Sequence, residues 1–208
     1  MAATTFGSVH VTDTVLSESV GGTPLVRLNN VVPNGCGTVW LKMESVNPTG
    51  SYKDRMAVAV LGRAIQRGDV QPGDRVVEYT GGSTGTALAF VAARLGLRFI
   101  AVSSDAFSEA KLSSMRAYGA EVIVEESEGG AITPELIGRM KSRAQQLVSE
   151  EGCFYTDQFG SPDVLVGYEP MGVEIAEQTR GIVDVICAGV GTGGALMGAV
   201  NGIDGKGV

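Results

Sequence analysis

Histidine and cysteine are scarce in this sequence of 208 residues. The chain holds one histidine, His10, and three cysteines, Cys36, Cys153 and Cys187, which lie far apart. A single histidine excludes a Ser-His-Asp triad and a metal site with several histidine ligands. Three dispersed cysteines fit reduced thiols better than a disulfide framework or a zinc site. We therefore expect no metal and a cytoplasmic location.

Basic charge and long apolar runs are also lacking. The formal net charge is −7, whereas a surface that binds nucleic acid or an anionic membrane needs clustered lysine and arginine. No apolar run is long enough to span a membrane, and residues 1–15 lack the basic and then apolar pattern of a signal peptide. We therefore expect no nucleic-acid partner and no membrane partner.

Glycine is abundant, with 30 residues, and apolar segments alternate in kind along the chain. Short apolar runs predict buried strands, and apolar residues at every third or fourth position predict helices. The expected strands cover 37–43, 74–80, 98–104, 121–126, 153–156 and 183–190. The expected helices cover about 51–68, 84–95, 108–118, 134–150 and 163–179, with interruptions at Gly167, Pro170 and Gly172. A last helix is expected to start at Gly194 and to dissolve within 201–208.

This alternation predicts an α/β protein with a mainly parallel sheet that helices cover on both faces. In such sheets, ligands bind beyond the carboxyl ends of the strands. Two glycine-rich segments, at 80–85 and 189–194, follow expected strands and fall at that edge. Both are therefore candidates for ligand binding.

Lys53 follows a pattern that marks the start of a helix. Ser51 is a favourable N-cap residue, and Asp54 completes a capping-box-like pattern three positions later. The positive end of the helix dipole lowers the pKa of a lysine in the first turn, which suits a lysine that must form a Schiff base. The same pattern also fits an ordinary capped helix with a solvated lysine.

The segment Thr80–Gly85 lies between a strand and a helix. Its hydroxyl groups and the free N–H groups of a helix start suit a carboxylate, although a tight turn with an N-cap explains the same residues. Gln158 follows the expected strand at 153–156. Its amide could donate to a substrate carboxylate, but a lone glutamine is more often an ordinary surface residue.

The segment Gly189–Gly194 places backbone N–H groups at another helix start, where they suit a phosphate. It also satisfies GxGxxG, a pattern of dinucleotide-binding proteins that is weak on its own. The dinucleotide interpretation requires an acidic residue about 20 positions later, after a second strand. The chain ends too soon to supply one, so a dinucleotide-dependent oxidoreductase is disfavoured.

Five motifs resemble, in their order, the fold-type II enzymes that use pyridoxal 5'-phosphate (PLP), in particular the cysteine synthase and cystathionine β-synthase family. They are GGTPLVRL at 21–28, LKMESVNPTGSYKDR at 41–55, EYTGGSTGTALA at 78–89, DQF at 157–159 and GVGTGGAL at 189–196. The resemblance implies two mainly parallel sheets flanked by helices, as in the tryptophan synthase β subunit. It also implies a smaller domain at 48–152 with the substrate-carboxylate loop. A PLP-anchoring domain from 1–47 and 153–208 would be incomplete.

The resemblance also implies roles for individual positions. Lys53 would hold PLP through a Schiff base and move the substrate α-proton. The PLP phosphate would be bound by Gly191, Thr192, Gly193, Gly194 and Ala195. The substrate carboxylate would be bound by Thr80, Gly81, Gly82, Ser83 and Thr84, with assistance from Gln158.

One departure from the family concerns the substrate loop. The family usually has Ser-Gly-Asn where this chain has Gly81-Gly82-Ser83. The family asparagine would form a hydrogen bond with the phenolic oxygen of PLP. Ser83 would take its place as a cofactor contact, but its side chain is shorter. The choice of substrate is therefore open.

The implied reaction is β-replacement, in which an activated serine such as O-acetylserine loses its leaving group and sulfide or another thiol adds. The family also implies a homodimer for the full-length protein. A serine or threonine dehydratase or racemase of the same fold type is the nearest alternative. Because family members continue well past residue 208, an inactive fragment that only binds a partner is an alternative of another class.

Overall fold

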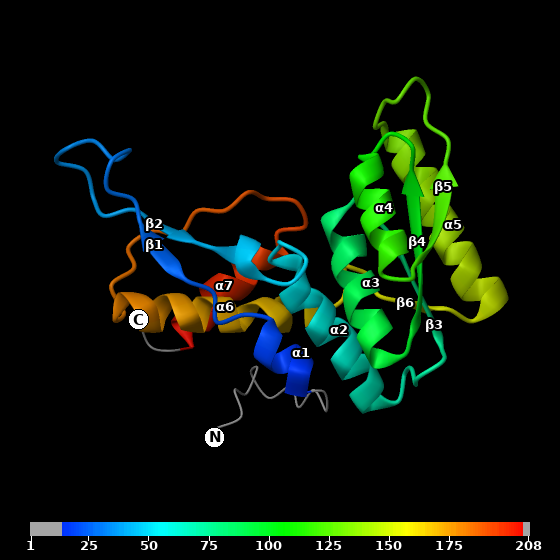
Figure 1. Ribbon diagram of the computed structural model, residues 1–208, viewed down its shortest axis with the longest axis horizontal. Helices are drawn as coiled ribbons and strands as arrows, with labels where there is room; N and C mark the ends of the chain where they lie inside the picture. The colour runs from blue at the N-terminus through cyan, green and yellow to red at the C-terminus, as the bar shows by residue number, and fades with distance from the viewer. Residues whose placement is uncertain (1–13, 206–208) are drawn as a thin grey trace.

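A computed structural model describes residues 14–205 and shows an α/β fold built around a parallel sheet (Figure 1). The sheet has four strands in the order β5-β4-β3-β6, and each neighbouring pair runs parallel. Their bounds are Arg75–Tyr79 (β3), Arg98–Ser104 (β4), Glu121–Glu125 (β5) and Phe154–Tyr155 (β6). The predicted strands agree with these bounds to within one residue at each end.

Helices cover both faces of this sheet, as expected. They are α3 (Ser83–Leu95), α4 (Glu109–Ala117) and α5 (Pro134–Glu151), each within one residue of the prediction. Val76 and Phe99 belong to a core cluster with residues of α3 and α4, whereas Val77 and Ile100 belong to a second cluster with residues of α5. Central strands that are buried on both faces explain the continuous apolar runs in the sequence.

A second group of elements lies beside the sheet (Figure 1). Helix α2 connects the two groups, because it packs against α3 on one side and α6 on the other. The remaining elements include an antiparallel strand pair, β1 with β2. Their bounds are α1 Thr14–Ser19, β1 Leu25–Arg27, β2 Trp40–Lys42, the 3-10 helix η1 Glu44–Val46, α2 Lys53–Arg67, α6 Asp163–Thr179 and α7 Gly194–Asp204. The division into domains at residues 48 and 152 stays a prediction.

Helix α6 has the expected bounds but lacks the expected interruptions, and α7 is longer than we expected. Helix α6 runs unbroken past Pro170, and α7 continues to Asp204 instead of dissolving. Glycines allow the two backbones to approach closely: a Cβ atom at Gly172 would lie 2.8 Å from the carbonyl carbon of Ala199, and one at Gly202 would lie 2.9 Å from that of Glu169. The expected interruptions were wrong because this packing outweighs the low helix propensity of glycine and proline.

The strand expected at 183–190 does not form. Residues 185–190 have no regular secondary structure, and the side chains of Ile182, Val185 and Val190 are 75%, 77% and 71% exposed. A strand needs a neighbour for its backbone hydrogen bonds, and among residues 14–205 none pairs with this segment. The second sheet of the described chain is therefore only the antiparallel pair of β1 and β2.

His10 and most of the amino-terminal lead-in lie outside the described residues. Within residues 14–205, Cys36 and Cys187 are exposed free thiols and Cys153 is a buried one. The same part of the chain has no group of three or more histidine, cysteine, aspartate or glutamate residues placed to hold a metal ion. None of its helices is both long and apolar enough to cross a membrane.

Candidate active site

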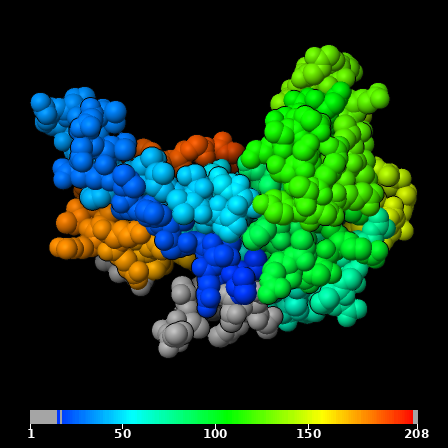
Figure 2. Space-filling model, in the orientation of Figure 1, coloured from blue at the N-terminus to red at the C-terminus, as the bar shows by residue number. Residues whose placement is uncertain are grey.

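The candidate site residues lie at the carboxyl end of β3 and at the amino ends of three helices. Helix α2 begins at Lys53, α3 at Ser83 and α7 at Gly194. The space-filling view is hollowed along its upper side, between the green surface of the sheet group and the blue and cyan surface of the β1–β2 group (Figure 2). The free N–H groups of helix starts favour anionic groups of a ligand.

Lys53 is the first residue of α2 and is only 9% exposed. Burial of its ammonium lowers the pKa of Lys53, and the charge of Glu78 opposes this shift. The lowered pKa therefore has burial as its main cause, whereas the sequence had pointed to the helix dipole. A buried lysine with a lowered pKa supplies the neutral amine that Schiff-base chemistry requires.

The start of α2 is fixed by different contacts from the expected capping box. Ser51 Oγ accepts a 3.1 Å hydrogen bond from the N–H of Lys53. The carboxylate of Asp54, however, accepts from both the N–H and the hydroxyl of Thr49. Asp54 reaches this partner because Gly50, with φ of +75°, turns the chain back over the helix start. The capping box was therefore wrong in its partners, although Lys53 lies in the first turn as predicted.

The substrate loop predicted at Thr80–Thr84 is held in a compact turn at the start of α3. Thr80 Oγ1 accepts 3.2 Å hydrogen bonds from the N–H groups of Gly82 and Gly85. The ring of Phe107 covers Gly81 so closely that a Cβ atom there would lie 2.7 Å from Phe107 Cδ1. The loop therefore has little room for side chains at this point.

The structure brings Gln158 to this loop. Thr84 Oγ1 donates a 2.7 Å hydrogen bond to Gln158 Oε1, and Gln158 Nε2 donates to the carbonyl oxygen of Tyr79 at 3.1 Å. Both Thr84 and Gln158 are buried. Two residues that the sequence singled out separately thus form one unit, and Gln158 is not the ordinary surface residue of the alternative interpretation.

Glu78 is a buried residue of the site that the sequence analysis missed. Its carboxylate accepts hydrogen bonds from the hydroxyl of Thr156 at 2.7 Å and from the N–H of Gln158 at 2.9 Å. Burial raises the pKa of Glu78 to about 7. A charged residue within the apolar strand at 74–80 was the available signal. The hydrogen bond from the N–H of Gln158 to Glu78 therefore fixes the backbone of Gln158.

The segment 189–194 forms an open cradle before α7. A Cβ atom at Gly189, Gly191 or Gly193 would meet no atom within 4 Å, and Gly193 has a φ of +80°. The N–H of Gly194 donates to Thr192 Oγ1 at 3.3 Å, whereas the described residues offer no acceptor to the N–H groups of Gly191, Thr192 and Gly193. Ala195 follows in the first turn of α7. This arrangement fits a phosphate group.

Two tyrosines connect Lys53 with this cradle. Lys53 Nζ lies 5.3 Å from the ring centroid of Tyr52, and the rings of Tyr52 and Tyr168 meet edge to face at 5.8 Å. Tyr168 Cε2 in turn would lie 3.5 Å from a Cβ atom at Gly194. The amine and the phosphate cradle are therefore linked by contacts through one aromatic pair. No hydrogen bond joins the cradle to the Thr80–Thr84 loop in the described part of the chain.

These residues fit PLP by their chemistry. The cofactor requires an amine that can lose its proton, which Lys53 offers, and an anion site for its phosphate, which 191–194 offers. Ser83 begins α3 and is half-buried.

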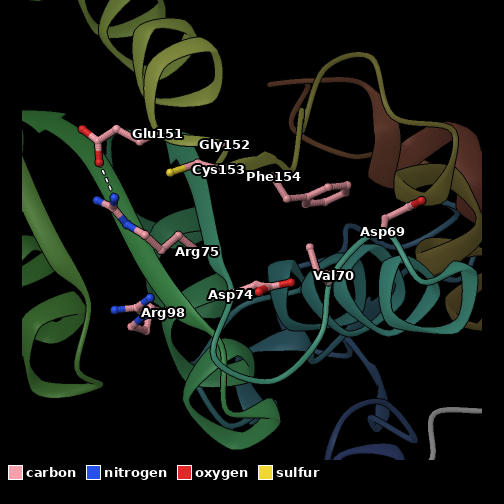
Figure 3. A pocket seen from close by; sticks show the side chains of 9 residues that line it. All are labelled: Asp69, Val70, Asp74, Arg75, Arg98, Glu151, Gly152, Cys153 and Phe154. Carbon is pink, nitrogen blue, oxygen red and sulfur yellow. Dashed lines mark hydrogen bonds and ion pairs between the residues drawn. The ribbon is translucent and has the colours of Figure 1, made fainter.

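A separate pocket of about 490 Å³ lies at the opposite, amino-terminal edge of the sheet (Figure 3). Its lining is charged, and Arg75 forms an ion pair with Glu151 across it. The lining residues are Asp69, Val70, Asp74, Arg75, Arg98, Glu151, Gly152, Cys153 and Phe154. Parallel α/β sheets bind ligands at the other edge, so we do not assign the site to this pocket.

Comparison with known proteins shows that the chain is similar to pyridoxal-phosphate dependent enzymes. Residues 16–207 match the family described as pyridoxal-phosphate dependent enzyme. Cysteine synthase of Staphylococcus aureus is 38% identical over 188 residues, and cysteine synthase B of Escherichia coli is 38% identical over 185 residues. The alignments cover 88% of this chain but only 58% and 59% of these relatives.

Solved structures agree with this assignment. O-ureido-L-serine synthase is 34% identical with a TM-score of 0.80, and the match covers 92% of this chain and 59% of that one. Cysteine synthase of Entamoeba histolytica is 32% identical with a TM-score of 0.82, and the match covers 92% and 56%. The α/β fold with a parallel sheet flanked by helices is thus shared over part of their length. The chain belongs to the family of pyridoxal-phosphate dependent enzymes.

Proposed function

We propose that this chain carries the PLP site and the substrate site of a β-replacement enzyme of the cysteine synthase kind. The substrate would be an activated serine such as O-acetylserine, and the incoming nucleophile would be sulfide or another thiol. The observation that carries the proposal is the buried Lys53, whose lowered pKa favours a neutral amine and which Tyr52 and Tyr168 connect to a candidate phosphate cradle. The relatives named cysteine synthase support the same reaction.

Lys53 would bind PLP and then carry the α-proton of the substrate. Bound PLP would withdraw the electrons that remain at the substrate α-carbon. A neutral amine accepts a proton, so the burial that lowers the pKa of Lys53 also favours its action as a base. Glu78, whose charge interacts with Lys53, would limit how far that pKa falls.

The loop Thr80–Thr84 and Gln158 would bind the substrate carboxylate. Backbone N–H groups at the start of α3 favour an anion there. Gln158 uses one amide hydrogen on Tyr79, which leaves the second for a ligand. The full-length protein would act as a homodimer, as the family resemblance implies, and its composition favours the cytoplasm.

The test compares the unsubstituted chain with Lys53→Ala. We expect the unsubstituted chain to develop the visible absorbance of protein-bound PLP and the Lys53→Ala variant to lack it, because only an amine forms the Schiff base. Lys141→Ala, on the exposed face of α5, is the matched control and should bind PLP normally. Equal absorbance in Lys53→Ala would refute the assignment of the lysine.

Product analysis separates the remaining alternatives. O-acetylserine with sulfide should give cysteine, whereas a dehydratase or racemase would instead convert serine or threonine. The chain spans about three fifths of the length of its relatives. PLP binding without turnover of any of these substrates would therefore favour the alternative of a protein that acts only by binding.

A further inference from the structure

Tyr168 has a fully buried hydroxyl group without a hydrogen-bond partner among the described residues. A tyrosine that is buried usually pairs its hydroxyl, because an unpaired polar group away from water costs free energy. The proposed reaction does not use this group. A buried donor without a partner suggests that a bound ligand accepts its hydrogen bond.

The side chain of Tyr168 points toward the amino end of α7. The Cβ atom of Tyr168 packs against Gly198, where an added Cβ atom would lie 2.6 Å from it. Its tip reaches one turn earlier, to Gly194, where an added Cβ atom would lie 3.5 Å from Cε2. Because Cε2 adjoins the carbon that bears the hydroxyl, the hydroxyl end of the ring faces the first turn of this helix.

The segment directly before α7 also has backbone N–H groups without an acceptor among the described residues. Helix α7 has 11 residues, and the N–H groups of Gly191, Thr192 and Gly193 have no acceptor within residues 14–205. Burial raises the pKa of the Tyr168 hydroxyl well above its usual value. The group therefore keeps its proton at any physiological pH and can act only as a donor toward an anion.

We propose that the Tyr168 hydroxyl donates a hydrogen bond to a phosphate group held at the amino end of α7. This inference rests on the proposed function, which places the phosphate monoester of PLP there. Inorganic phosphate shares the same chemistry. Tyr168 would then be a cofactor-binding residue contributed by α6, in addition to the backbone groups of 191–194.

The test uses Tyr168→Phe, which removes only the hydroxyl, with Tyr118→Phe as the matched control. Tyr118 is an exposed residue directly after α4, and its ring packs on Phe90. A hydrogen bond to a charged group corresponds to roughly a tenfold change in affinity or more. We expect Tyr168→Phe to weaken PLP binding about tenfold or more, and to leave the binding of pyridoxal, which lacks the phosphate, unchanged.

Thermal unfolding without cofactor gives a second readout. Tyr168→Phe should unfold at the same or a higher temperature than the unsubstituted chain, because it removes an unpaired buried hydroxyl. Inorganic phosphate should stabilise the unsubstituted chain and the Tyr118→Phe variant more than Tyr168→Phe. Equal phosphate protection in all three, or equal weakening of PLP and pyridoxal, would overturn the inference.

Carbon-13 labelling at tyrosine Cζ tests the unsubstituted chain, so the inference remains testable if Tyr168→Phe fails to fold. The Tyr168 resonance should move on addition of inorganic phosphate or PLP, and should stay in place with pyridoxal. An unmoved resonance in the presence of saturating phosphate contradicts the inference. If the chain binds neither PLP nor pyridoxal, the proposed function fails, while the phosphate experiment still decides the role of Tyr168.

Discussion

Thr84 Oγ1 donates a 2.7 Å hydrogen bond to Gln158 Oε1 across 74 positions of the sequence. This bond joins the start of α3 to the loop that follows β6. Since Gln158 Nε2 donates to Tyr79 at the same time, both sides of the amide are fixed and its orientation is set. One amide hydrogen remains for a substrate carboxylate.

The first prediction concerns Gln158→Glu. A carboxylate at this position loses the donor to Tyr79 and repels the carboxylate of the substrate. We expect the KM for the amino-acid substrate to rise about tenfold or more, with PLP content unchanged. Steady-state kinetics measures this effect, and Gln145→Glu on the exposed face of α5 serves as the control. An unchanged KM would remove Gln158 from the substrate site.

The second prediction concerns the contact between Gly81 and Phe107. Gly81→Ser introduces the usual family residue, but its Cβ atom would lie 2.7 Å from Phe107 Cδ1. We expect this change to lower the free energy of unfolding by about 1–3 kcal/mol. The double substitution Gly81→Ser with Phe107→Ala should regain part of that loss. Urea denaturation measures both, and purely additive effects would show that the two residues are not coupled.

The third prediction concerns pH and Glu78. Its pKa is raised to about 7 from an ordinary value of 4.5, so folding favours the protonated form. Its protonation supports stability fully below about pH 4.5, and this support is lost as the pH rises through about 7. A shift of this size corresponds to about 3 kcal/mol.

Glu78→Gln isolates this effect, because its side-chain oxygen can still accept from Thr156 and Gln158. We expect the variant to gain stability relative to the unsubstituted chain as the pH rises from about 5 to about 8. Urea denaturation across this range measures the difference between the two proteins. A difference that does not depend on pH would show that Glu78 titrates normally.

The fourth prediction concerns the ion cluster around Arg55, a fully buried side chain. Glu174 accepts two 2.8 Å hydrogen bonds from Arg55 and one of 2.6 Å from Lys42. Burial alone would raise the pKa of Glu174, but the hydrogen bonds and charge of Arg55 prevail and lower it to about 2. Its contribution to stability is therefore present above about pH 4.5 and is lost as the pH falls through about 2.

Glu174→Gln leaves Arg55 with less compensating charge in a buried position. We expect the free energy of unfolding to fall by about 3–5 kcal/mol at neutral pH. Glu177→Gln, one turn along the same helix but exposed, should change it by less than about 1 kcal/mol. Thermal or urea unfolding compares the two variants, and equal losses would mean that burial of the cluster contributes nothing.

Most of the fold was predictable because its signals are local. The apolar runs of β3 and β4 and the glycine after each helix marked the elements of the sheet to within one residue. The roles of Lys53 and the loop at 80–84 were predicted from the order and spacing of motifs, and they stay predictions. Glu78 and Tyr168 were missed because their contacts are distant in sequence. Glu78 pairs with Thr156, 78 positions later, and Tyr168 packs against α7.

The wrong predictions have the same origin. The apolar residues of 183–190 have the composition of a strand, but composition does not say whether a neighbouring strand is present to pair with them. Pro170 is a helix breaker by propensity, yet α6, which packs against α2 and α7, continues through it. Local sequence patterns indicate the secondary structure that a segment prefers, and contacts with distant residues determine the structure that it adopts.

The glycine-lined contact between α6 and α7 makes the peptide link between these helices dispensable for holding them together. Residues 182–190 form a largely exposed connection, whereas Gly172 and Gly202 bring the helix backbones into direct contact. A protease that cuts this connection would leave α7 seated on α6. The cut chain would migrate as one noncovalent particle until a denaturant separates its pieces.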